Sequence, residues 1–484
     1  MSDRTTTLPT APAADLGVRP EAVQAFVTEL QRNAVEVHGL AVVRRGHLVQ
    51  LGAWAPWQQP RPTLAYSVSK TLTASCVSIA IGDGLLKLDD RVVDVLGKEL
   101  TGPLAPGVEQ IIVHQLLSMA TGHTTDTLPA MQWKSDAIKA FCSQAPQAEP
   151  GSVFCYNNGA TWMLGELVRR VTGERLVDFA TRRFLAPLGI TDLHWQESFG
   201  AEFGFSGCFL TVEQIAAIAE LYRCDGVWQG ERLLPEGWVE RAGREQISTA
   251  GEENAHSAMG YGYQLWRHPD GYRLDGAFAQ YGIVLPEQEA VIAVTSGSFP
   301  SVGVMSAVLA HLQPGLTPLT GNPVQAGEPE QVRGLEVPWP ARDSDPVRPV
   351  KATGAVRSEQ PADAVDPWWF PELADAEVRA AGGGWRLDLT LAGESTGVDL
   401  GTTAWLTTEL AAEEGKIVPV ATRCRRDGDR TTVSLAFIDT PHRLTLTLTE
   451  AVAVQRWNCP PLNGAPLAGL SASYETLTPS VPAP

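Results

Sequence analysis

A proline-rich segment divides this chain of 484 residues into two parts of different character. Eight prolines fall within residues 314 to 349, a density that suits a linker or a surface-wrapping segment better than a packed helix or strand. At roughly 100–200 residues per domain, the length also argues for two or three domains. We therefore predict a mobile N-terminal tail (1–15), a first domain (16–313), a linker (314–350), a second domain (351–476) and a C-terminal tail (477–484).

The first part mixes strands and helices in an order that is typical of an α+β domain. Two β-rich runs in Gly39–Trp54 predict a hairpin that turns at Arg45–His47. Near the other end, strands over 277–285 and 290–295 predict a second hairpin. Helices are expected over 21–33, 160–170, 176–184 and 302–312. Strands that are far apart in sequence can share one antiparallel sheet with helices on its faces, and we expect that arrangement here.

The second part is all β. Short segments of alternating apolar and polar residues follow one another at nearly regular spacing, which indicates a small antiparallel sandwich or barrel. These predicted strands are residues 385–391, 404–409, 417–422, 431–436, 444–449 and 452–457.

Charge and cysteine content argue against several kinds of partner and site. A formal net charge of −18 repels phosphate backbones and anionic lipids, so neither nucleic acid nor a membrane surface is expected as a partner. The chain opens without the apolar core of a secretory signal, which predicts a cytoplasmic protein. Its seven cysteines are scattered and form no CxxC pair, so we expect reduced thiols and no metal site.

The first candidate for chemistry is Ser67-Val68-Ser69-Lys70, directly before the small and apolar run Thr71–Ile81. If that run is a buried helix, Ser67 and Lys70 lie on one of its faces, three residues apart. A serine hydroxyl needs a nearby base to act as a nucleophile, and a desolvated lysine can be that base. The helix N-terminus adds N–H groups where negative charge develops on an attacked carbonyl. Alone, the motif is also compatible with a capping serine and a surface lysine.

Two further segments contain groups that such a serine would need. Tyr156-Asn157-Asn158 precedes a predicted helix, and a tyrosine hydroxyl there can relay a proton while an asparagine amide holds a lysine. Leu274-Asp275-Gly276-Ala277 stands at the entry to the late strand, where a backbone N–H can supply the second half of an oxyanion hole. The small residues Gly276 and Ala277 would let a substrate approach closely.

Together these segments make residues 20–312 resemble the serine β-lactamase and penicillin-binding-protein superfamily. The resemblance is greatest to its class C β-lactamase-like branch, which includes esterases, amidases and D-amino-acid peptidases. It rests on the order Ser-x-x-Lys, Tyr-x-Asn and a small-residue strand motif, and on the segments Tyr66–Lys70, Gly84–Asp90, Leu116–His123, Gly207–Glu213 and Gly276–Tyr281.

The resemblance implies a role for each of these residues. Ser67 would be the acylated nucleophile, Lys70 and Tyr156 would share the general-base role, and Asn158 would support the lysine and the substrate. Backbone N–H groups of Ser67 and Ala277 would form the oxyanion hole. Neither a metal nor an organic cofactor is implied. The same resemblance suggests a lipocalin-like C-terminal β domain acting as a lid, a wall or a dimer-forming module; its one histidine is His442.

The third motif departs from the family pattern, because the cation that usually holds a substrate carboxylate is missing. Leu274 takes its place, or Arg273 lies near it in another register. We therefore expect a cytoplasmic serine hydrolase acting on a small ester or amide. The alternatives are a β-lactamase or D-amino-acid peptidase (DD-carboxypeptidase) and a non-catalytic penicillin-binding-like scaffold. Gly276 and His123 are further candidates for substrate contacts, and a homo-oligomer is left open.

Overall fold

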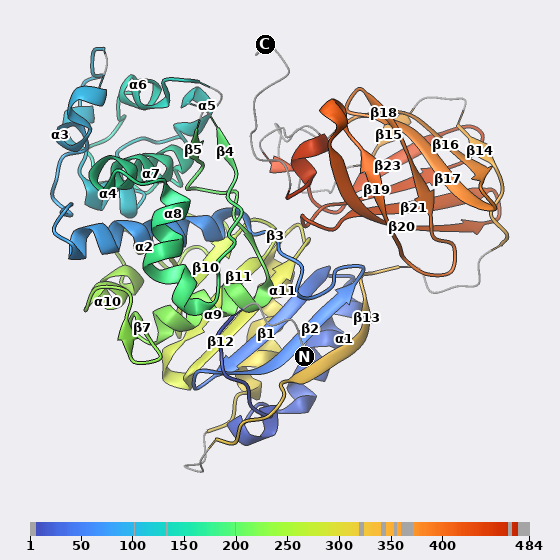
Figure 1. Cartoon of the computed structure of the whole chain (residues 1–484), viewed down its shortest axis with the longest axis horizontal. Coiled ribbons are helices and arrows are strands. Elements are labelled where there is room, and N and C mark those ends of the chain that lie inside the picture. Colours follow the sequence, from blue (N-terminus) through green and yellow to red (C-terminus); the bar gives the residue numbers. More distant parts are fainter. Residues whose placement is uncertain are drawn as a thin grey trace.

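The computed structural model describes residues 6–100, 102–131, 134–198, 200–318, 324–339, 345–352, 356–359, 371–462 and 467–472. Figure 1 shows a sheet with helices around it, a helical region beside that sheet, and a separate β structure formed by the C-terminal residues. The fold class predicted from the sequence is confirmed. The predicted C-terminal tail, residues 477–484, lies outside the described residues.

A seven-stranded sheet forms the centre of the first part, in the order β13-β2-β1-β12-β11-β10-β9. All of its pairs are antiparallel except the one between β13 and β2. Strand β1 is buried along its whole length, as expected for a strand covered on both faces. The strands are β1 (Val37–Arg44), β2 (His47–Ala55), β9 (Trp266–His268), β10 (Gly271–Gly276), β11 (Gln280–Leu285), β12 (Ala290–Ser296) and β13 (Glu330–Glu336).

Helices cover both faces of this sheet. On one face lie α1 (Pro20–Arg32) and α11 (Val302–Ala307), which continues as a helical turn through Leu312. Helix α1 buries one stripe, formed by Ala22, Val23, Phe26, Val27 and Leu30, which is the stripe expected from its spacing. On the other face, α9 (Val212–Arg223) packs against β11, β12 and β1.

Helix α2 (Ser69–Gly82) runs from the sheet into the helical region. Nearly all of its residues are buried, as expected for a helix that is apolar or small on every side. The main helices around it are α3 (Val92–Leu96), α4 (Val113–Leu117), α5 (Leu128–Met131), α6 (Ala137–Cys142), α7 (Asn158–Thr172), α8 (Leu176–Ala180) and α10 (Trp238–Gly243).

Three details differ from the sequence-based expectation. Near the end of the first part, three successive antiparallel strands take the place of the predicted hairpin, because β10 precedes β11 and pairs with it. Ala277 lies in the turn between β10 and β11 rather than in a strand. The predicted linker contains β13, which adds a parallel strand to the edge of the sheet beside β2. Part of the predicted N-terminal tail is packed, because Leu8 and Ala11 are buried and the backbone there hydrogen-bonds to Leu48.

The C-terminal residues form two sheets around one core. Their orders are β14-β16-β17-β18 and β15-β23-β22-β21-β20-β19, and they adjoin where β18 meets β19 and β15 meets β16. The strands are β14 (Val350–Lys351), β15 (Val356–Ser358), β16 (Leu373–Ala381), β17 (Gly384–Leu391), β18 (Glu394–Leu400), β19 (Leu406–Ala411), β20 (Ile417–Asp427), β21 (Arg430–Phe437), β22 (Arg443–Leu448) and β23 (Ala453–Trp457).

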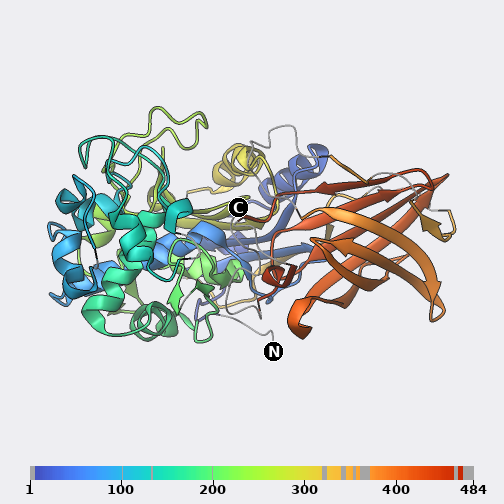
Figure 2. The ribbon, with the colours of Figure 1, turned by 90° about the horizontal axis from the view of Figure 1, so that it is seen from above.

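The β21–β22 loop and the segment after β23 contact the first part of the chain. Figure 2 shows this C-terminal β domain beside the first part. At the junction, Glu36 before β1 is buried against Arg443 and accepts a hydrogen bond from Asn458 Nδ2 at 3.0 Å. Trp57 Nε1 donates to Thr440 O at 3.1 Å, also in a buried position. These polar contacts are enclosed by both parts, so they fix how the two parts dock.

Candidate active site

Ser67 lies at the point where the chain enters α2. Residues Tyr66–Val68 form a short helical turn that continues into α2, so Ser67 stands in a first helical turn, where backbone N–H groups have no partner within the helix. Tyr66, directly before it, has a φ of 49° and therefore lies in the left-handed region, which is unfavourable for an aromatic residue. The nucleophile candidate thus follows a sharply bent, buried backbone segment.

Lys70 is buried, and its Nζ contacts three acceptors. It lies 2.9 Å from Ser67 Oγ, 2.7 Å from Asn158 Oδ1 and 2.8 Å from Phe205 O. Burial lowers the pKa of Lys70 to about 7, although the charges of Asp126 and Asp275 act in the opposite direction. A lysine in this state can be neutral near physiological pH and accept a proton from the hydroxyl that it touches.

Asn158, the first residue of α7, is held in one orientation. Its Nδ2 donates to Asp126 Oδ2 at 2.6 Å, which leaves Oδ1 to face Lys70. Asp126 Oδ1 also accepts from the backbone N–H of Leu128 at 3.0 Å, which fixes the carboxylate itself. The amide orientation of Asn158 therefore follows from its partners, and its oxygen takes one N–H of Lys70.

Tyr156 lies over the same lysine. Lys70 Nζ is 4.7 Å from the centre of the Tyr156 ring, and the ring stacks on Trp266 at a centroid distance of 5.8 Å. Burial raises the pKa of the Tyr156 hydroxyl above its ordinary value, and a hydrogen bond with Ser67 lowers it by less. The phenol therefore stays protonated at neutral pH and is placed to donate a proton rather than to take one.

A cleft of about 450 Å³ opens over these groups, and Ser67, Tyr156, Asn158 and Ala277 all line it. The preceding glycine, Gly276, allows close packing, because a Cβ there would lie 2.3 Å from the carbonyl oxygen of Ala65. The turn that contains Ala277 is therefore pressed against the segment that leads to Ser67. Ser67 and Ala277, whose backbone N–H groups are the candidates for the oxyanion hole, therefore lie at the same cleft.

The residues near the usual carboxylate-binding position do not present a free cation. Leu274 is buried, and the Arg273 guanidinium is only 2% exposed. Arg273 donates through Nε to Asp275 at 2.7 Å and through Nη1 to His256 O at 2.8 Å. Arg273 and Asp275 both line the cleft, and the Asp275 side chain, at 20% exposure, is the more exposed member of this ion pair.

The structure does not bring His123 to the cleft. Its ring is buried beside Phe141, with Nδ1 2.9 Å from Thr121 Oγ1 and Nε2 2.9 Å from Gln144 O. Both nitrogens thus have partners inside the helical region, so His123 supports that region and does not line the cleft.

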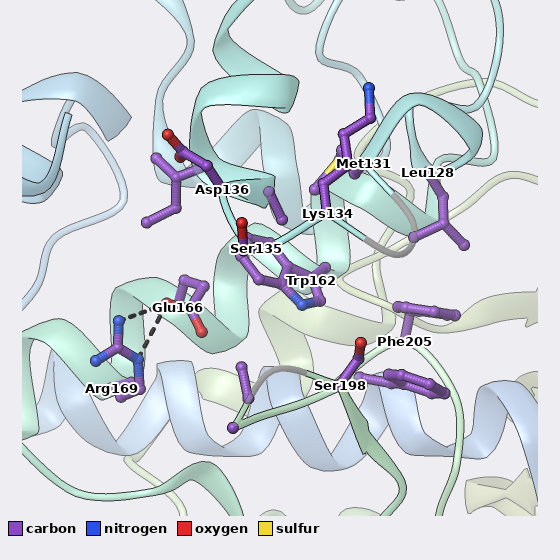
Figure 3. Close-up of a pocket in the computed structure, with 15 residues that line it drawn as sticks. Leu128, Met131, Lys134, Ser135, Asp136, Trp162, Glu166, Arg169, Ser198 and Phe205 are labelled. Carbon is purple, nitrogen blue, oxygen red and sulfur yellow. Dashed lines mark hydrogen bonds and ion pairs between the residues drawn. The ribbon is translucent and has the colours of Figure 1, made fainter. Parts of the chain in front are cut away.

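A second cavity of about 290 Å³ lies in the helical region (Figure 3). Trp162, Phe203 and Phe205 contribute aromatic walls, and the Glu166–Arg169 ion pair lies at one end. Phe205 lines this cavity and the cleft above Ser67, so the two spaces share one wall.

Three contributors to the site were not predicted. Asp126 orients Asn158, the carbonyl of Phe205 binds Lys70, and Leu462 of the C-terminal segment lines the cleft. Asp126 lies in a threonine-rich loop just after the segment Leu116–His123, and no pattern in that loop indicates its role; backbone carbonyls carry no sequence signal. Leu462 reaches the cleft through domain docking, which local patterns do not reveal.

Comparison with protein-family models assigns most of the first part of the chain to one family. Residues 22–312 match the Beta-lactamase family model. The chain belongs to the Beta-lactamase family. This range includes Ser67, Lys70, Tyr156, Asn158 and Ala277, and it ends before the C-terminal β domain.

Among curated proteins, this Beta-lactamase family member is 28% identical over 151 residues to a lovastatin esterase of Penicillium rubens. That match covers 26% of this chain and 37% of the esterase, so it spans well under half of that relative. This relative is named as an esterase.

Solved structures share the fold. A putative 6-aminohexanoate-dimer hydrolase from Bacillus anthracis is similar with a TM-score of 0.51 and 19% identity, covering 64% of this chain and 87% of that one. An octameric penicillin-binding protein homologue from Pyrococcus abyssi has a TM-score of 0.50 and 15% identity, covering 88% of this chain and 97% of that one. The second match extends well beyond the Beta-lactamase family range, so it includes C-terminal residues of this family member as well.

Within the described residues, no group of three or more His, Cys, Asp or Glu side chains is arranged to hold a metal ion. Nor does any helix in that part of this Beta-lactamase family member have the length and apolarity needed to cross a membrane.

Proposed function

We propose that this chain is a serine hydrolase that cleaves a small ester or amide through an acyl-enzyme on Ser67. The observation that carries the proposal is the 2.9 Å contact between Lys70 Nζ and Ser67 Oγ, made by a lysine whose pKa burial lowers to about 7. Of the groups around the serine, Lys70 is the one that can be unprotonated at neutral pH, whereas the pKa of Tyr156 is raised.

The hydrogen bonds of Lys70 define where the proton would go. Asn158 Oδ1 and the carbonyl of Phe205 can only accept, so they take the two hydrogens of the neutral amine. The lone pair then faces Ser67 Oγ, accepts its proton, and the oxygen attacks the substrate carbonyl. Backbone N–H groups of Ser67 and Ala277 would stabilise the oxyanion.

Collapse of this intermediate expels the alcohol or amine. The protonated Tyr156 would give its proton to that leaving group and be reprotonated from Lys70. Water would then attack the acyl-enzyme, with neutral Lys70 accepting a proton from the water and returning it to Ser67 Oγ as the acid is released.

The cleft favours substrates without a carboxylate near the scissile bond. Arg273 is occupied by Asp275 and a backbone carbonyl, and Leu274 offers no charge. Loss of a charge-assisted contact costs roughly 1.5–3 kcal/mol, and the partly buried Asp275 carboxylate, where ionised, would repel a second carboxylate. Simple esters and amides therefore fit this site better than β-lactams or D-alanyl peptides, and the curated relative is named as an esterase.

The test compares wild-type protein with Ser67→Ala on p-nitrophenyl acetate, p-nitrophenyl butyrate and nitrocefin. Wild type should hydrolyse the esters, and the variant should lose that turnover by at least about 1,000-fold. Equal ester turnover by both proteins would reject the proposal. Faster Ser67-dependent hydrolysis of nitrocefin than of esters would favour a β-lactamase. Failure of a fluorophosphonate probe to label Ser67 would favour a non-catalytic scaffold.

A further inference from the structure

One side chain of the C-terminal β domain, His442, contacts the side chains of Tyr66 and Phe278, which flank the two residues that would form the oxyanion hole. It lies between β21 and β22 and is fully buried, 376 residues beyond Tyr66. Its Nε2 is 2.6 Å from the hydroxyl of Tyr66, the residue directly before Ser67. A buried polar contact this short, at such sequence separation, can form only when the two parts of the chain are docked.

The partners of His442 determine its tautomer. Nδ1 faces the carbonyl oxygen of Cys459 at 3.1 Å, and a carbonyl can only accept, so Nδ1 carries the proton. Nε2 is then an acceptor, and the Tyr66 hydroxyl donates to it. The backbone N–H of Leu462 lies 3.5 Å from the same hydroxyl oxygen, at the outer limit of a hydrogen bond. Burial lowers the pKa of His442 to about 3, so the ring stays neutral and this arrangement does not change across the neutral range.

His442 also packs on the other half of the candidate oxyanion hole. Phe278, the residue directly after Ala277, makes edge contacts with His442 at 5.8 Å and with Tyr66 at 5.3 Å between ring centres. Both Tyr66 and Phe278 have left-handed backbones, with φ values of 49° and 64°. Bulky residues adopt this conformation only where surrounding contacts hold them in it.

We propose that His442 is a positioning residue that sets the spacing of the two oxyanion-hole N–H groups by holding Tyr66 and Phe278. This inference rests on the proposed function and assigns to the C-terminal β domain a part in the chemistry of the first domain. His442 acts through its neighbours: it is not among the residues that line the cleft, whereas Tyr66 and Leu462 are.

A matched pair of variants tests the proposal in the full-length chain. Tyr66→Phe removes only the hydroxyl that binds His442. Trp57→Phe removes one buried hydrogen bond across the same junction, to Thr440, by a side chain that does not line the cleft. We expect Tyr66→Phe to lower kcat on p-nitrophenyl acetate by about tenfold or more with little change in KM, because small displacements of oxyanion donors are costly. Trp57→Phe should keep wild-type kcat.

Two further measurements separate positioning from a general loss of stability. His442→Leu and the double variant Tyr66→Phe/His442→Leu complete a cycle, in which the double variant should be no slower than the slower single variant. Amide exchange of the peptide containing residues 64–68 should accelerate in Tyr66→Phe and stay unchanged in Trp57→Phe.

Wild-type kcat in Tyr66→Phe, or equal losses of kcat in Tyr66→Phe and Trp57→Phe, would overturn the proposal. Amide exchange needs no turnover. If Ser67→Ala showed that the proposed function is wrong, the exchange result would still decide whether His442 holds this backbone.

Discussion

The side chain of Lys70 is buried, and its Nζ lies within hydrogen-bond distance of three oxygen atoms. In the proposed mechanism, the two carbonyl acceptors take the hydrogens of the neutral amine, and the proton is exchanged at the contact with Ser67. Asp126 affects Lys70 in two ways: it orients Asn158, and its negative charge raises the pKa of Lys70.

The rate of ester cleavage should therefore rise with pH around neutrality. Only neutral Lys70 can take the Ser67 proton, and its pKa is about 7, so kcat/KM should increase through that value and level off above it. The measurement is kcat/KM for p-nitrophenyl acetate between pH 5.5 and 9, corrected for spontaneous hydrolysis. A flat profile, or a rate that falls between pH 6 and 8, would contradict the role of Lys70.

Asp126→Asn should move this profile to lower pH. The substitution removes a charge that raises the pKa of Lys70, so the amine loses its proton more readily. The maximal rate should also fall, because Asn158 loses a partner that fixes its amide. Asp94→Asn, at an exposed position paired with Arg91, provides the control and should leave the profile unchanged. A shift to higher pH in Asp126→Asn would refute this account.

At the scale of elements, the site depends on how closely the β10–β11 turn approaches the start of α2. Gly276 makes this approach sterically feasible, since any side chain there would collide with the backbone of Ala65. The polar groups around Ser67 then come from α2, from α7 and the segment directly before it, and from the turn.

Gly276→Ala should lower both activity and stability. A Cβ 2.3 Å from the Ala65 oxygen forces the turn away from Ser67, so we expect kcat to fall at least about tenfold and the protein to lose about 1–3 kcal/mol of unfolding free energy. Ester kinetics and urea unfolding measure the two effects. Gly384→Ala in β17, where the nearest other atom to the added Cβ is 3.8 Å away, should change neither. Wild-type kinetics in Gly276→Ala would show that the close approach is unnecessary.

Local patterns predicted the elements better than the contacts between them. The apolar spacing of α1 and the turn at Arg45–His47 are properties of short segments, and both were found as expected. Strand β13 lacks such a signal, because it lies at a sheet edge with mostly exposed side chains in a proline-rich segment. The juxtaposition of Ser67, Lys70, Tyr156 and Asn158 followed from a family resemblance, whereas nothing near His442 in the sequence pointed to Tyr66.

At the scale of the whole molecule, docking of the C-terminal β domain depends on a buried ion pair. Burial raises the pKa of Glu36, but the charge of Arg443 and the hydrogen bonds from His38 and Arg443 lower it to about 2. The carboxylate accepts from Arg443 Nε at 3.1 Å, from His38 Nε2 at 3.0 Å and from Asn458 Nδ2 at 3.0 Å.

This pair should make the protein less stable in acid. The pKa of Glu36 is lower in the folded state than its ordinary value of 4.5, so its stabilising contribution is present above pH 4.5 and is lost as the pH falls towards 2. Arg443→Met leaves the carboxylate buried without its ion-pair partner and should destabilise the protein by about 3–5 kcal/mol at pH 7. The difference in free energy of unfolding between wild type and this variant should become smaller as the pH falls.

Urea unfolding at pH 7, 5 and 3 measures the difference in stability between wild type and Arg443→Met. Arg244→Met removes an exposed pair with Glu240 and should cost less than about 1 kcal/mol at every pH. A gap between wild type and Arg443→Met that stays constant from pH 7 to pH 3 would show that Glu36 is not the group responsible.

The contact between Tyr66 and His442 also bears on how the protein is made. During translation the serine emerges early, whereas the imidazole that its neighbour binds follows 376 residues later. On the ribosome, the residue before Ser67 would therefore lack this partner until the segment around His442 has been synthesised.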